Sequence, residues 1–156
     1  MRFAFIAALL LAFGCVSAYD ETYAKETEML EQAEQKRQAE EAAAHAEARK
    51  YAAVVYFDVN SAEIKDAREL DWFVKQMQPY PQAIIQVQGF ADSTGTESLN
   101  QELSEQRATS VAQDLGSAGI DPAQIRTEGF ASQYAARPNV TAEGRQRNRR
   151  VEVTVR

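Results

Sequence analysis

The chain has 156 residues, of which 45% are apolar and 26% charged, and its formal net charge is −6. This length and composition suit one globular domain with additional segments. The single cysteine excludes an internal disulfide, and the negative charge argues against a nucleic-acid partner.

Residues 1–18 have the layout of a secretory signal. Arg2 precedes an apolar run from Phe3 to Phe13, and the small residues Gly14, Ser17 and Ala18 follow it. The run is too short to span a bilayer, so it is expected to direct export rather than to anchor the chain as a helix. The sequence therefore predicts an exported protein.

Cys15 lies where the apolar run ends, and a lone thiol in an exported chain requires an explanation. The segment "LAFGC" resembles the bacterial lipobox, whose cysteine becomes the lipidated first residue after cleavage. Acylation of Cys15, with Val16 after it, would place the protein at the periplasmic face of the outer membrane. The alternative is ordinary cleavage after Ala18, which would discard Cys15 and yield a soluble periplasmic protein.

Residues 19–50 form a segment of different composition. It lacks Gly and Pro and consists mainly of Glu, Ala, Gln, Lys and Arg, which are strong helix formers. Large apolar residues are few, so a helix here buries little surface by itself. The sequence predicts a charged helical spacer that is either solvated or a weak coiled coil, through which the chain would self-associate or bind envelope proteins.

The folded domain is predicted over residues 51–156. Asn60 or Ser61 is expected to cap a first helix that runs to Met77, and Ser98 with Gln101 resembles a capping box for a second helix. The expected strands are "AAVVYF", "AIIQVQGFA", "IRTEGFA" and "RVEVTV", with a short turn of helix at "DPAQ". Strands that alternate with helices predict an α+β two-layer sandwich, with two main helices on a mixed sheet.

Arg107 lies on the apolar face of the second predicted helix. At helical spacing its neighbours on that face are Leu103 and Val111. A guanidinium stays charged and is costly to bury without a partner. Its partner is either Asp92, in a structural ion pair, or a ligand carboxylate; the residues alone favour the ion pair, because such pairs outnumber ligand sites.

The same segments carry a family resemblance. The blocks "VYFDVNSAEI", "VQGFADSTGTESLNQELSEQRATSV", "GIDPAQIRTEGFA" and "NVTAEGRQRNRRVEV" resemble the OmpA-like C-terminal domain in order and spacing. That family includes the peptidoglycan-associated lipoproteins. The resemblance covers Val54 to Val155 and implies non-covalent binding of peptidoglycan, which would tether the outer membrane or envelope to the cell wall.

The resemblance also implies a site. In the family, an Asp after the second strand and an Arg on the next helix hold the diaminopimelate of the stem peptide, and Asp92 and Arg107 match these two. Other matching positions are Asn100 and Leu103 in the pocket wall, Asp58 and Asn60 at its rim, and Arg149 beside it. The family's usual His and Thr before the Asp are replaced here by Phe90 and Ala91.

A catalytic function is not expected. Residues 51–156 contain no Cys and no His, so nucleophilic triads and zinc sites lack their ligands. We expect no metal and no cofactor. The remaining alternative is a structural envelope protein that binds other proteins through the spacer helix, with Asp92 and Arg107 forming a structural ion pair.

Overall fold

The computed structural model describes the backbone of residues 2–156 and the side-chain surroundings of residues 21–156. The chain divides into two compact units, Met1–Ala43 and Ala44–Arg156. The predicted signal segment and Cys15 lie outside the described side chains.

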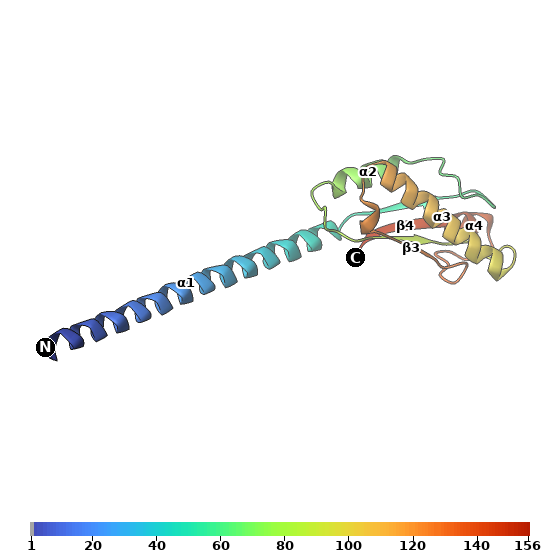
Figure 1. The fold of residues 1–156 in the computed structure, drawn as a ribbon. Coiled ribbons are helices and arrows are strands. Elements are labelled where there is room, and N and C mark those ends of the chain that lie inside the picture. The colour runs from blue at the N-terminus through green and yellow to red at the C-terminus, as the bar shows by residue number, and fades with distance from the viewer. Residues whose placement is uncertain (1) are drawn as a thin grey trace. The chain divides into compact units, whose positions relative to one another are not determined.

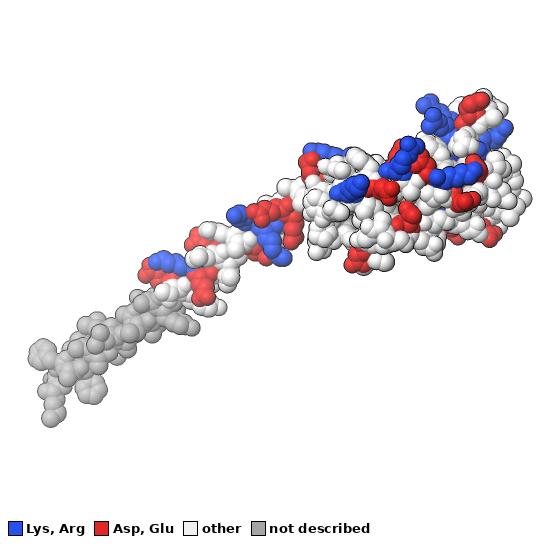
Figure 2. All heavy atoms as spheres, turned by 90° about the horizontal axis from the view of Figure 1, so that it is seen from above, with Lys and Arg blue, Asp and Glu red and all other residues white. Residues whose placement is uncertain are grey.

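The first unit consists of helix α1 (Arg2–Ala48), whose last turn belongs to the second unit. From residue 21 to residue 44 all side chains of α1 are exposed. Acidic and basic side chains alternate along it (Figure 2) and form pairs three or four residues apart, such as Lys25 with Glu21 and Arg37 with Glu34. The segment is therefore helical, with side chains that this chain itself does not bury. Within the part of the chain that was described, no helix has an apolar stretch that would cross a membrane.

The second unit is built on a four-stranded sheet. Its strands are β1 (Ala52–Tyr56), β2 (Ile85–Gly89), β3 (Ile125–Gly129) and β4 (Arg150–Val155). They lie in the order β1-β4-β2-β3; β4 is antiparallel to β1 and β2, and β2 is parallel to β3. The expected mixed sheet is confirmed.

The sheet is covered on one face by α2 (Arg68–Met77) and α3 (Glu97–Ser117), as Figure 1 shows. A 3₁₀ turn (Pro122–Gln124) precedes β3, and a short α4 (Ala142–Asn148) precedes β4. The predicted α+β sandwich with two main helices is confirmed. The sequence analysis missed α4, because its seven residues include no large apolar side chain that would mark a buried face.

The core lies between the helices and the inner face of the sheet. It contains alternate residues of the strands and one face of each main helix: Val55, Phe57, Leu70, Phe73, Ile85, Val87, Val111, Leu115, Val151 and Val153. The backbone of α3 approaches β2 closely, since a Cβ on Gly89 would lie 2.0 Å from the carbonyl oxygen of Ser104. Glycine at this position therefore allows α3 to lie directly on the end of β2.

Two predicted helix starts were wrong. α2 begins at Arg68 rather than near Ser61, because Asn60 has a φ of +54°, a left-handed conformation that turns the chain before any helix forms. The residue that caps α3 is Thr96, whose hydroxyl accepts a hydrogen bond from the Leu99 amide at 3.3 Å, and not Ser98.

Candidate functional site

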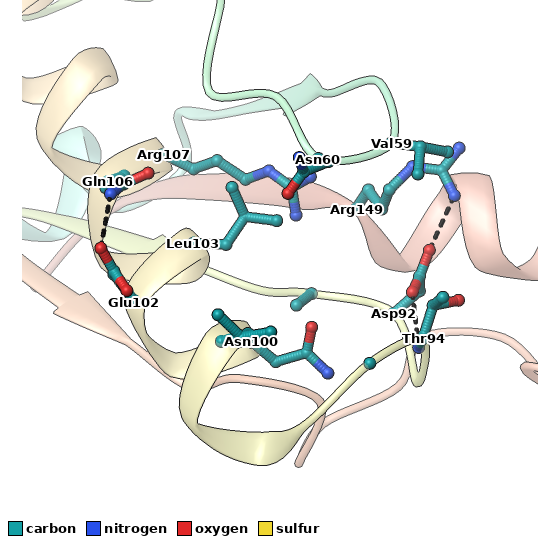
Figure 3. A pocket seen from close by; sticks show the side chains of 13 residues that line it. Val59, Asn60, Asp92, Thr94, Asn100, Glu102, Leu103, Gln106, Arg107 and Arg149 are labelled. Atoms are coloured by element: carbon teal, nitrogen blue, oxygen red, sulfur yellow. Dashed lines mark hydrogen bonds and ion pairs between the residues drawn. The ribbon is translucent and has the colours of Figure 1, made fainter.

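A pocket of about 450 Å³ opens where the loops after β1 and β2 meet the first turns of α3 and the end of α4. Its lining residues come from four separate parts of the chain (Figure 3): Val59, Asn60, Ala91, Asp92, Thr94, Gly95, Leu99, Asn100, Glu102, Leu103, Gln106, Arg107 and Arg149. Six of the lining residues belong to α3, at positions three and four apart, which share one face of a helix.

Arg107 is completely buried, as its position on the apolar face predicted. Its Nε donates to the carbonyl of Ser61 at 2.8 Å, Nη1 to that of Phe90 at 3.1 Å and Nη2 to that of Asp58 at 2.9 Å. Among the described residues, no carboxylate lies within ion-pair distance of this guanidinium. Burial, aided by the nearby charge of Arg149, lowers the pKa of Arg107 to about 10.

Asp92 pairs with Arg149 rather than with Arg107. One carboxylate oxygen accepts a hydrogen bond from Nη1 of Arg149 at 2.8 Å, and the other accepts from the Thr94 amide at 2.8 Å (Figure 3). The alternative of a structural ion pair between Asp92 and Arg107 is therefore wrong. Burial acts to raise the pKa of Asp92, but the hydrogen bonds from Arg149 and Thr94 outweigh it and leave the pKa below its ordinary value.

Arg149 is held in place by the end of α4 and the end of β1. Its Nε donates to the carbonyl of Phe57 at 3.1 Å, and its Nη2 contacts the side chain of Gln146. Arg149 is 7% exposed and Asp92 is 5% exposed. The buried charges of the pocket are thus two arginines and one aspartate, which leave one net positive charge for an anionic group to neutralise.

Most of the predicted site residues are brought together. Asn60, Asn100 and Leu103 line the pocket beside Asp92, Arg107 and Arg149. Asp58 is the exception: its carboxylate points to solvent and pairs with Lys65, whose contact lowers the pKa of Asp58. Only the backbone carbonyl of Asp58 serves the site, through its hydrogen bond from Arg107.

The sequence analysis missed the mouth of the pocket. Val59 and Leu99 lie there with exposed fractions of 65% and 60%, and Gln106 donates to Glu102 at 3.1 Å on the side away from Asp92 (Figure 3). Leu99 and Gln106 could have been predicted as lining residues, because helical spacing places them on the same side of α3 as Leu103. Exposed apolar groups beside a buried cation suit a ligand that has both an alkyl segment and a carboxylate.

Phe90, one of the two departures from the family pattern, faces away from the pocket. Its ring stacks on Phe130 at 5.5 Å between centroids and lies under the guanidinium of Arg150 at 4.0 Å. Phe90 therefore serves the site through its carbonyl, which accepts from Arg107, and not through its side chain.

Over the described residues, no group of three or more His, Cys, Asp or Glu side chains is arranged to hold a metal ion.

The pocket lies in a segment that a known family shares. Residues 56–149 match the model of the OmpA family, which is more than half of the chain. The protein therefore belongs to the OmpA family, as the sequence blocks indicated.

Individual relatives support this assignment. The chain is 43% identical over 103 residues to the "Probable lipoprotein YiaD" of Escherichia coli (strain K12), which is 65% of this chain and 47% of that protein. It is 38% identical over 90 residues to the "Peptidoglycan-binding protein ArfA" of Mycobacterium tuberculosis, which is 58% of this chain and 28% of that protein. The match thus spans half or less of these curated relatives.

The fold also matches a solved structure. The crystal structure of the peptidoglycan-associated lipoprotein from Burkholderia pseudomallei aligns with a TM-score of 0.64 and 25% identity. The alignment covers 67% of this chain and 90% of that one. The likeness therefore covers nearly the whole of the Burkholderia chain and confirms the predicted α+β fold.

Proposed function

We propose that this protein binds peptidoglycan non-covalently through the pocket at the first turns of α3 and thereby tethers the cell envelope to the wall. Two of its relatives bear names that state such an association, peptidoglycan-binding in one case and peptidoglycan-associated in the other. We propose a binding role without catalysis.

The observation that carries this proposal is the state of Arg107. Its guanidinium is fully buried and lines a pocket, and among the described residues it donates hydrogen bonds only to backbone carbonyls and lies over the Phe57 ring at 5.4 Å. A guanidinium has five N–H donors, and three of them are used by these carbonyls. A ligand carboxylate would take up the remaining donors and neutralise the net positive charge of the pocket.

The proposed ligand group is the free end of diaminopimelate in the stem peptide. This end has an ammonium and a carboxylate on one carbon, joined to the peptide by a short alkyl chain. The carboxylate would bind Arg107, and the ammonium would bind Asp92, whose oxygens have lone pairs left beyond Arg149 and Thr94. Leu103 and Leu99 would contact the alkyl chain.

The sharpest test changes the ligand, because Arg107 also holds the loops after β1 and β2 through its carbonyl contacts, and its removal would disturb them. Calorimetry would compare a stem peptide that contains diaminopimelate with one that contains lysine, which lacks the second carboxylate. We expect about thirtyfold or more weaker binding of the lysine peptide, since an unpaired buried charge costs about 2 kcal/mol or more. Equal affinities would contradict the role of Arg107.

A protein-side test uses Asp92→Asn, with Arg147→Ala as a matched control. Asp92→Asn should greatly reduce co-sedimentation with purified peptidoglycan, because it removes the carboxylate that receives the ammonium. Arg147 is exposed and lies over the Tyr56 ring, outside the pocket, so its removal should leave co-sedimentation unchanged. An equal loss of binding in both variants would contradict the assignment of the pocket as the binding site.

We also propose that Cys15 is acylated and anchors the protein in the outer membrane. The name of the Escherichia coli relative supports a lipoprotein. Cys15→Ser should leave wall binding in vitro intact but change the fractionation of the protein in cells. Mass spectrometry of the mature N-terminus decides the question: a start at Tyr19 would mean a soluble periplasmic wall-binding protein.

A further inference from the structure

The loop that carries Asp92 has a second attachment to the end of α4, formed by Asn139. The side-chain oxygen of Asn139 accepts hydrogen bonds from the Ser93 amide at 3.2 Å and from Nδ2 of Asn148 at 2.8 Å. Asn139 thus joins Ser93, 46 positions before it, to Asn148, nine positions after it.

Both partners of Asn139 at the α4 end are firmly placed. Asn148 is fully buried and forms hydrogen bonds with both the amide and the carbonyl of Arg137, at 2.9 and 2.8 Å. The backbone carbonyl of Asn139 accepts from Nη1 of Arg145 at 2.9 Å. The side-chain oxygen of Asn139 is therefore a fixed acceptor rather than a mobile surface group.

Two adjacent residues consequently hold the same loop in different ways. Arg149 holds the Asp92 side chain by an ion pair, and Asn148, through Asn139, holds the backbone of Ser93. The backbone before Asp92 is anchored by the Ala91 amide, which donates to the carbonyl of Ala131 at 2.7 Å. The link from Ser93 to Asn139 anchors the backbone after Asp92, so both sides of this residue are held and the direction of its free lone pairs is fixed.

We propose that Asn139 is a positioning residue, whose side-chain oxygen fixes the Asp92 loop in the conformation that receives the ligand ammonium. This inference rests on the proposed function only in its second half, the effect on binding. The first half, that Asn139 fixes the loop, concerns the free protein. An isolated Asn in a loop has no such role; the double acceptance by one oxygen between two pocket-forming segments argues for it.

The test compares three variants of the full chain. Asn139→Ala removes the acceptor, and Asn139→Asp keeps an oxygen at the same place. Thr141→Ala is the matched control, because it removes the N-cap of α4, where the Thr141 hydroxyl accepts from the Gly144 amide at 2.9 Å, and leaves the link to Ser93 intact.

The first measurement is hydrogen exchange of individual amides by NMR. We expect the Ser93 amide to exchange about threefold to tenfold faster in Asn139→Ala, the range that one lost hydrogen bond of ordinary strength produces. The exchange rate of the Ser93 amide should stay near the wild-type rate in Asn139→Asp and in Thr141→Ala. An unchanged Ser93 rate in Asn139→Ala, or an equal rise at all amides of the domain, overturns the proposal.

The second measurement is calorimetry with meso-diaminopimelate. The affinity of Asn139→Ala should fall by about threefold to tenfold, while that of Thr141→Ala stays unchanged. Faster Ser93 exchange with unchanged affinity overturns the positioning role. If the wild-type protein binds no diaminopimelate, the proposed function fails, whereas Ser93 exchange still decides whether Asn139 fixes the loop.

Discussion

At the scale of single residues, the pocket depends on which groups bind the three buried charged side chains, Asp92, Arg107 and Arg149. Arg107 takes backbone carbonyls, while Asp92 and Arg149 take each other. Sequence analysis correctly identified Arg107 as buried, because helical periodicity is a local property of the chain. The ion-pair alternative gave Asp92 the wrong arginine, since the choice between two arginines for one aspartate depends on loop geometry.

The Asp92–Arg149 pair predicts how stability depends on pH. Because the pKa of Asp92 in the folded protein lies below the ordinary 3.8, its stabilising effect is complete above that value and is lost as the pH falls through the folded pKa. Asp92→Asn should therefore lower the unfolding free energy at pH 7 and flatten its decline below pH 4, as urea unfolding from pH 7 to pH 2 would show.

Asp58→Asn is the control for this prediction. The pKa of Asp58 is also lowered, by Lys65, but this pair is exposed to solvent and is expected to contribute little to stability. An acid decline in Asp92→Asn as steep as that of the wild type would contradict the assigned role of the Asp92–Arg149 pair.

At the scale of elements, α3 matters most, because it carries Asn100, Leu103 and Arg107 to the pocket. Its helical periodicity made the element predictable, whereas its first residue depended on the turn before it. Gly95 has a φ of +90°, and Thr96 is extended, so Thr96 rather than Ser98 has the conformation of an N-cap. By residue preference alone, Ser98 is the better capping residue, so the sequence favoured the wrong position.

The cap of α3 can be tested by two matched substitutions. Thr96→Ala should lower the unfolding free energy by about 1 kcal/mol, because it removes the acceptor for the Leu99 amide. Ser98 lies in the same exposed turn, and Ser98→Ala should change the unfolding free energy by less than about 0.5 kcal/mol. Denaturant unfolding measures the unfolding free energy of both variants, provided that their m-values equal that of the wild type. A larger loss in Ser98→Ala than in Thr96→Ala would indicate that Ser98 is the cap.

At the scale of the whole molecule, the chain consists of two units with different physics. The side chains of residues 21–43 are exposed, and several of the charged ones form ion pairs along the helix, whereas the apolar core lies within residues 48–155. Ala48, in the last turn of α1, is fully buried in that core. The second unit therefore begins at Ala44, seven residues before the predicted boundary at Tyr51.

This division predicts that residues 44–156 fold by themselves. Their urea midpoint should equal that of the longer chain, because the removed segment contributes no buried side chain from residue 21 onward. A shorter version that starts at Tyr51 should be less stable, since it lacks Ala48. A markedly lower midpoint for residues 44–156 would show that the spacer stabilises the domain.

The sequence by itself determined the features that depend on neighbours along the chain. These are the helical spacer, the order of strands and helices, and the burial of Arg107, which follow from propensity and periodicity. Tertiary structure alone decided which distant groups meet. Asp92 and Arg149 are 57 positions apart, and Ser93 and Asn139 are 46 apart. The sequence contains many acids, arginines and amides with similar pairing energies, and only the packing of α3 and α4 against the sheet selects among them.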